Sequence, residues 1–307
     1  MKYFKVKASR MAERYEITSE EFTKRTERKK PFEQCVSGSA LSQFGICPSC
    51  LNPIQLIGIN KKISCAPYGR HTGKTIPGLP SWNYYKYRFC PFSKKSDRHE
   101  PNDEELLEIS EDVVELYDIL KKQFDRVVYV IRKELNIDCS VSFWTKALKQ
   151  YVSSKAYCYP WLTEVNLPYI FAYMGMQQLP LLGQKFMVGT DLYDALCSHS
   201  NVKFVYLSDK DGNELKESKY RRLSNCGDYL DLCFRFTDHK QQATDGKELR
   251  ETMIFCVDDM QTNTAIYEKA ISFDETYFMN IVASGKEDKR QKWLLDIAEE
   301  NMPELHL

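Results

Sequence analysis

The sequence predicts an α+β protein in which a small cysteine-containing module precedes a larger domain of helices followed by an antiparallel sheet. Three observations lead to this prediction. Cysteines and short extended pieces occupy the stretch from Cys47 to Cys90, an apolar stripe with helical spacing runs from Leu106 to Leu135, and apolar residues alternate with period two after Gly189.

Charge divides the chain into three regions, although its net charge is zero. Residues 35–99 hold nine Lys and Arg against a single acid, Asp97, for a charge of +8; residues 1–34 carry +4 and residues 100–307 carry −12. We therefore expect a charged N-terminal arm or helix (1–34), a basic module (35–99) and an acidic body (100–307). Such a division favours an anionic partner for the basic part.

The N-terminal residues predict a cytoplasmic location. Met1–Lys7 lacks the apolar core and the small-residue cleavage site of a secretory signal. The most apolar window, 167–188, is interrupted by two prolines and three glutamines, so no membrane contact is expected. In a reducing cytoplasm, eleven cysteines indicate metal ligation more than disulfide bonds.

The first 60 residues are expected to contain a short helix and short extended pieces. Ser19–Phe22 predicts the start of a short helix capped by Ser19, and the mostly basic stretch Arg25–Lys30 predicts a solvated arm or helix end, with phosphate contact as the alternative. Residues 35–60 contain no charge, and glycines and prolines divide them into short extended pieces typical of ribbon strands. A module this small needs help to fold, and a bound metal can supply on the order of 10 kcal/mol.

Four positions in the module have the spacing of a structural zinc site. Cys47 and Cys50 form a Cys-x-x-Cys pair, and Cys90 is the preferred third ligand because a proline follows it, as one follows Cys47. Cys65 and His71 compete for the fourth position, and Cys65 is preferred because the residues before it resemble a ribbon strand. Four ligands would leave no coordination position for a catalytic water.

The pattern departs from a standard zinc ribbon in two respects. Its second half is not a Cys-x-x-Cys pair, and Leu51 stands where such a turn usually has glycine. The alternatives are buried thiols without a metal and a redox Cys-x-x-Cys, which the additional ligands and the absence of a βαβ context disfavour.

A run of aromatic and basic residues, Trp82–Phe89, indicates nucleic-acid binding. Cations bind phosphates and aromatic faces stack on unpaired bases, whether DNA or RNA. If the run is a strand, Tyr85 and Lys86 face opposite sides. Alternatively, the aromatics form the core of the module and the cations keep it soluble. The predicted nucleic-acid-binding residues are Arg70, Lys74, Trp82, Tyr85, Lys86, Arg88, Lys94 and Lys95.

Two further motifs are incomplete. Gly69–Thr75 ends like a phosphate-binding loop but has three residues between its glycines instead of four, and no long helix follows. Asp209–Asn213 resembles part of a calcium loop, but its glycine is misplaced and the twelfth position is Tyr220, so a hairpin turn is expected. No histidine lies in a recognisable catalytic pattern, and no motif supports a reaction class.

The acidic body is predicted from periodicity. Asn102 and Glu105 form a capping box before nine helically spaced apolar residues, which predicts a helix over 103–135. Helices are also expected over 143–156, 161–176 and 286–300. Between the last two, alternating apolar residues predict an antiparallel sheet over about 202–257, with strands at 230–236 and 249–257 joined through Asp245-Gly246.

The sequence therefore favours a zinc-binding protein that contacts nucleic acid through its basic module. The alternative is an assembly subunit whose module docks on the acidic body of a protein partner or of a second copy. A nucleotide-dependent enzyme is a third, less favoured hypothesis.

Overall fold

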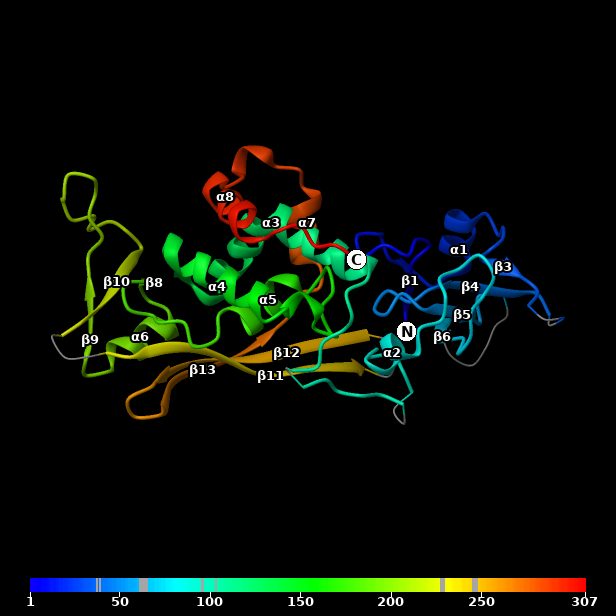
Figure 1. Cartoon of the computed structure of the whole chain (residues 1–307), viewed down its shortest axis with the longest axis horizontal. Coiled ribbons are helices and arrows are strands. Elements are labelled where there is room, and N and C mark those ends of the chain that lie inside the picture. The colour runs from blue at the N-terminus through cyan, green and yellow to red at the C-terminus, as the bar shows by residue number, and fades with distance from the viewer. Residues whose placement is uncertain are drawn as a thin grey trace. The chain divides into compact units, whose positions relative to one another are not determined.

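The computed structural model describes residues 1–36, 38, 40–60, 66–94, 97–102, 104–226, 230–244 and 248–307 (Figure 1). These residues form two compact units. The N-terminal unit comprises Met1–Glu115, Tyr159–Thr163 and Gln241–Arg250, and the C-terminal unit comprises Leu116–Cys158, Glu164–Lys240 and Glu251–Leu307. The predicted α+β class is confirmed, with helices in mid-chain and a sheet after them. The domain boundaries expected from charge stay a prediction.

Short antiparallel strands form the framework of the N-terminal unit. A four-stranded sheet has the order β3-β4-β5-β6, with Gln55 opposite both Phe44 and Arg70, and β1 pairs with β2. The elements are β1 (Tyr3–Phe4), β2 (Tyr15–Glu16), β3 (Glu33–Gln34), β4 (Ser42–Ile46), β5 (Pro53–Ile57), β6 (Tyr68–His71), α1 (Ser19–Thr26) and α2 (Tyr84–Arg88).

The core of the N-terminal unit draws on residues 1–34, which were expected to form an arm or helix. Phe4 of β1 and Phe22 of α1 are fully buried with Ile54 of β5. At Gly45 of β4 a Cβ atom would lie 3.0 Å from the Phe4 ring, so the close approach of this ring requires glycine. Apolar burial therefore makes the first 34 residues part of the folded unit.

Helix α1 forms near the predicted position but has a different cap. Thr18 Oγ1 accepts a hydrogen bond from the Glu21 N–H at 3.1 Å, so Thr18 is the N-cap and Ser19 is the first helical residue.

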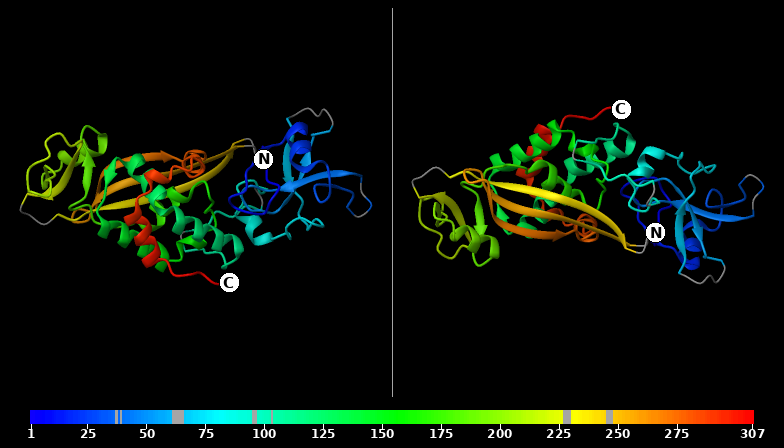
Figure 2. Two further views of the ribbon diagram at one scale, coloured as in Figure 1. Left: turned by 90° about the horizontal axis from the view of Figure 1, so that it is seen from above. Right: turned by 90° about the horizontal axis from the view of Figure 1, so that it is seen from below.

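The C-terminal unit places helices over one face of a three-stranded sheet. In Figures 1 and 2, α4 and α5 cover one face of the sheet β11-β12-β13. Between helix and sheet, the ring centroids of Phe143 in α4 and Phe234 in β11 lie 5.7 Å apart. A second sheet has the order β7-β8-β10-β9. The helices of this unit are α3 (Glu111–Leu135), α4 (Val141–Ser153), α5 (Leu167–Gly175), α6 (Asp191–Cys197), α7 (Tyr277–Ala283) and α8 (Lys292–Asn301); the strands are β7 (Ile137–Asp138), β8 (Lys185–Met187), β9 (Val202–Val205), β10 (Tyr220–Asn225), β11 (Leu232–Thr244), β12 (Glu248–Asp259) and β13 (Thr264–Ser272). One end each of α3, β11 and β12 belongs to the N-terminal unit.

None of the helices among the described residues combines the length with the apolar character that a membrane span needs.

The predicted start of the long helix is wrong. The capping box does form, since Glu105 N donates to Asn102 Oδ1 at 3.0 Å, yet α3 begins only at Glu111. The box closes one isolated turn that does not continue into a helix, and Glu105 also pairs with His99 at 2.8 Å. The predicted first residue, 103, lies outside the described residues. A non-helical Gln123 further interrupts the helix, so the apolar stripe spans two helical pieces.

Other boundaries also differ from the prediction. α5 begins at Leu167 because Pro168 suits its first turn, and the last helix begins at Lys292 after a 3₁₀ turn at Glu287–Lys289. The expected sheet is two sheets, and it continues past 257 through β13. The turn expected between the strands at 230–236 and 249–257 lies outside the described residues.

Candidate metal centre

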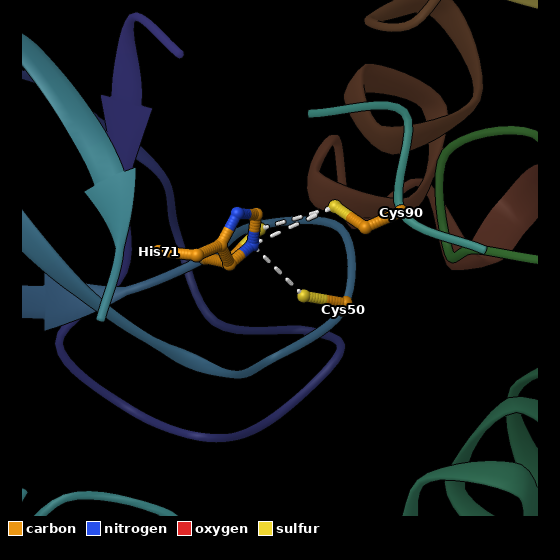
Figure 3. A group of neighbouring side chains, drawn as sticks. Cys50, His71 and Cys90 are labelled. Carbon is orange, nitrogen blue, oxygen red and sulfur yellow. Dashed lines mark hydrogen bonds between the residues drawn. The ribbon is translucent and has the colours of Figure 1, made fainter. Parts of the chain in front are cut away.

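Four side chains from three parts of the N-terminal unit converge on one point. Cys47 and Cys50 lie in the turn between β4 and β5, His71 ends β6, and Cys90 follows α2. One ligand atom from each residue lies within 4.8 Å of all the others. Figure 3 shows the His71 ring and the Cys50 and Cys90 sulfurs pointing toward one another. This group could hold a metal ion.

The spacing of these atoms fits a tetrahedral metal. Bond lengths of about 2.3 Å to sulfur and about 2.0 Å to nitrogen give edges of about 3.8 Å between sulfurs and about 3.5 Å between sulfur and nitrogen. Cys47 Sγ and Cys90 Sγ lie 3.8 Å apart, and His71 Nε2 lies 3.2 Å from Cys50 Sγ and 3.7 Å from Cys90 Sγ. A disulfide needs sulfurs at about 2.0 Å, so the cysteines are free thiols placed as ligands.

Burial and mutual hydrogen bonds shift the pKa values of Cys47 and Cys90 in opposite directions. Burial raises the pKa of Cys90, and hydrogen bonds with Cys47 and Cys50 raise it further. Burial would also raise the pKa of Cys47, but hydrogen bonds from Cys50 and Cys90 outweigh it, so this pKa lies well below its ordinary value. The Cys47 thiolate is thus stabilised by its neighbours, and a thiolate is the form in which cysteine binds a metal.

The Cys47–Cys50 turn has the backbone of a metal-binding knuckle. Leu51 N donates to Cys47 O at 3.1 Å, and Cys47 N donates to Asn52 O at 2.9 Å. Leu51 has a φ of 58°, a left-handed conformation that glycine usually adopts at about 1–2 kcal/mol lower cost. Its side chain is buried, which offsets this strain.

Asn52 connects the knuckle to the start of α2. Its Nδ2 donates to Cys50 Sγ at 3.4 Å and to Asn83 O at 2.9 Å, while its Oδ1 accepts from Asn83 N at 2.7 Å. Asn83 is the N-cap of α2, since its Oδ1 accepts from Lys86 N. One buried amide therefore fixes the helix that leads to Cys90 relative to Cys50.

Two aromatic rings pack against the His71 imidazole and against each other. The Tyr87 ring lies 5.1 Å from the imidazole and the Trp82 ring lies 6.1 Å from it, while the two rings are 5.0 Å apart. Tyr87 Oη also donates to Asp97 at 3.0 Å. Trp82, predicted to contact nucleic acid, is instead half-buried and packs against His71 and Tyr87.

A buried ion-pair network supports the knuckle. Arg10 Nη1 donates to Ser49 O at 2.6 Å and Arg10 Nη2 pairs with Asp112 at 3.0 Å, while Lys86 Nζ pairs with the other Asp112 oxygen. Burial would raise the pKa of Asp112, but Arg10 and Lys86 outweigh it and hold this pKa well below its ordinary value. Local motifs gave no signal for Arg10 or Asp112, because about 100 residues separate them.

The other residues predicted to bind nucleic acid differ in their exposure and in their contacts. Most of the run Trp82–Phe89 forms helix α2, so the alternation that a strand would impose on Tyr85 and Lys86 does not apply. Tyr85 is 43% exposed, and Lys86 is engaged by Asp112. Arg70, Lys74 and Lys94 are exposed, and Arg88 is half-buried. Cys65 and Lys95 lie outside the described residues, whereas His71 joins the cysteine cluster.

Comparison with known proteins finds no matching family model, no matching curated protein and no matching solved structure.

Proposed function

We propose that Cys47, Cys50, His71 and Cys90 bind one zinc ion that stabilises the fold of the N-terminal unit. The observation that supports this most strongly is the convergence of three sulfurs and one imidazole nitrogen at tetrahedral spacing. Soft thiolate and imidazole ligands favour zinc over Ca²⁺ or Mg²⁺, which prefer oxygen. Four protein ligands complete the shell, so the role of the ion is structural.

Elemental analysis of the purified protein tests this proposal. We expect one zinc per chain in the wild type and loss of the metal in Cys47→Ser. The matched control is Cys35→Ser, because Cys35 is an exposed thiol of the same unit outside the cluster. Full metal content in Cys47→Ser, or no metal in the wild type, would contradict the site.

We further infer that the N-terminal unit binds nucleic acid. Residues 35–99 carry a charge of +8, and Arg70, Lys74 and Lys94 expose their side chains. Exposed cations bind phosphates and release counterions, whereas Lys86 is already hydrogen-bonded to Asp112. Phosphate contact is therefore assigned to the exposed cations and Arg88.

An electrophoretic shift assay over a salt series tests nucleic-acid binding. We expect the affinity of the wild type to fall steeply with salt, and the combined Arg70→Ala, Lys74→Ala and Lys94→Ala variant to bind more weakly with a shallower slope. Lys210→Ala with Lys216→Ala is the control, because both are exposed lysines of the C-terminal unit. If neither single- nor double-stranded oligonucleotides bind at low salt, the inference is wrong; self-association in light scattering would then favour the assembly alternative.

A further inference from the structure

A pocket of about 590 Å³ opens beside α2 in the N-terminal unit. Its lining consists of Asn83, Tyr85 and Lys86 on one side and residues 106–110 on the other. This volume lies within the range of small-molecule sites, roughly 300–1,000 Å³. The segment 106–110 was predicted to be helical, and it borders the pocket because α3 begins only at Glu111.

The pocket offers an aromatic ring opposite aliphatic side chains. Tyr85 is 43% exposed, and its ring is held against Phe89 at 5.1 Å in an edge contact. Across the pocket, Leu106 and Leu107 are half-buried and Ile109 is 37% exposed. A flat apolar ligand can lie between these surfaces, with the fixed tyrosine ring as a stacking partner.

Hydrogen-bonding groups of both kinds accompany these apolar surfaces. Asn83 uses its Oδ1 to cap α2, and its Nδ2 has no acceptor among the described residues, so this group can donate to a ligand. Ser110 Oγ donates to Asp112 and can still accept, and the Glu108 carboxylate is exposed. An apolar face bordered by donors and acceptors matches a nucleobase, which has a π-face and a polar edge.

A cation lies on the same side of α2 as Tyr85. Arg88 follows Tyr85 by three residues, a spacing that places both on one helix face. His99 brings the end of this helix to the start of the pocket segment, since His99 N donates to Arg88 O at 2.8 Å and His99 Nε2 pairs with Glu105 at 2.8 Å. Lys86 is already hydrogen-bonded to Asp112, whereas the half-buried Arg88, which interacts electrostatically with Glu105, is the cation assigned to a phosphate beside the pocket.

We propose that this pocket receives one unpaired base of a single-stranded nucleic acid, stacked on Tyr85 with an adjacent phosphate at Arg88. The proposal rests on the nucleic-acid function inferred above and adds selectivity for single strands. A base in a duplex is stacked and paired on both sides, so it cannot enter the pocket without being extruded at additional cost. Charge at the exposed lysines would serve either form of nucleic acid, whereas the pocket serves only the unpaired one.

Fluorescence anisotropy with labelled single-stranded and duplex oligonucleotides tests the proposal. Loss of one stacked base in Tyr85→Ala should weaken single-strand binding about 5- to 150-fold, with Tyr85→Phe restoring most of the affinity. Tyr84→Ala is the matched control, because Tyr84 is 60% exposed on the same helix but does not line the pocket. An oligonucleotide of abasic sites should bind wild type and Tyr85→Ala equally. Zinc content and melting temperature show whether each variant is folded.

The outcomes separate this proposal from the underlying function. If the wild type binds no oligonucleotide at low salt, the nucleic-acid function itself fails. If the wild type binds but Tyr85→Ala binds as well as Tyr84→Ala, or duplex binds as tightly as single strand, the pocket assignment is wrong and the charge-based function stands. Weakened self-association of Tyr85→Ala without any change in oligonucleotide affinity would assign the pocket to a protein side chain and overturn the proposal.

Discussion

Replacing Asp112 by asparagine should destabilise the N-terminal unit more than any surface charge change. The side chains of Asp112 and Arg10 are 9% and 5% exposed, so removing the carboxylate charge leaves a buried guanidinium without its counterion. Lys86, whose side chain is 20% exposed, loses the same partner. Because Arg10 also donates to Ser49 O in the knuckle, the effect should reach the metal ligands.

The expected loss is about 3 kcal/mol. Removing one member of a buried ion pair costs about 3–5 kcal/mol, and asparagine retains an oxygen that can still accept from Arg10, so the lower end applies. The control Asp118→Asn lies on the same helix, but its pair with Lys122 joins side chains that are 50% and 72% exposed. Such a surface pair contributes about 0.5 kcal/mol or less.

A urea titration that follows zinc release with a chromophoric chelator reports on the N-terminal unit directly. We expect the release midpoint of Asp112→Asn to fall well below that of the wild type and of Asp118→Asn. The pKa of Asp112 is depressed in the folded state, so its stabilisation is complete above the ordinary pKa of about 4 and is lost as pH falls below it. The difference in release midpoint between variant and wild type should therefore stay constant from about pH 8 to 6, the range in which the deprotonated ligands hold the metal.

Two results would refute this reasoning. A difference of less than about 1 kcal/mol between Asp112→Asn and Asp118→Asn would mean that Arg10 is not held by the carboxylate. A difference in release midpoint that changes between about pH 8 and 6 would contradict the depressed pKa, because Asp112 stays ionised throughout that range.

Three further predictions concern stability. Thr18→Ala removes the cap of α1 and should cost about 1 kcal/mol in thermal unfolding; an unchanged melting temperature would exclude this cap. Leu120→Ala leaves a cavity where a fully buried side chain stood and should lower the free energy of unfolding by about 2–5 kcal/mol in urea denaturation. Tyr129→Ala, at an exposed position of the same helix, should lower it far less, and equal losses would contradict the packing. Glu251→Leu removes the oxygen that lies 2.7 Å from both the buried His239 and Asn166 Nδ2 and should cost about 1–3 kcal/mol by urea denaturation; a neutral result would mean that neither contact forms.

Elements with strong local periodicity were predictable from the sequence. Alternating apolar residues in 230–236 and 249–257 predicted two strands, and these strands, β11 and β12, are neighbours in one sheet. The apolar residues of 143–156 predicted α4 to within three residues at each end. These patterns succeed because burial of one face and the period of the backbone act within a single segment. The start of α3 was predicted wrongly because a capping box is a local signal that an isolated turn also satisfies, as Asn102 and Glu105 do here.

At the candidate metal centre too, local signals were visible in the sequence and long-range contacts were not. The sequence by itself determined the Cys47 and Cys50 pair, since two thiols three residues apart lie in one turn regardless of the rest of the chain. It also indicated Cys90, but it left His71 behind Cys65 as the fourth ligand. Only the tertiary structure brought His71 to the cluster, because the pairing of β6 with β5 carries the imidazole back to the knuckle. The long-range partners of Lys86 and Arg10 at Asp112 were likewise decided by packing, which no local pattern encodes.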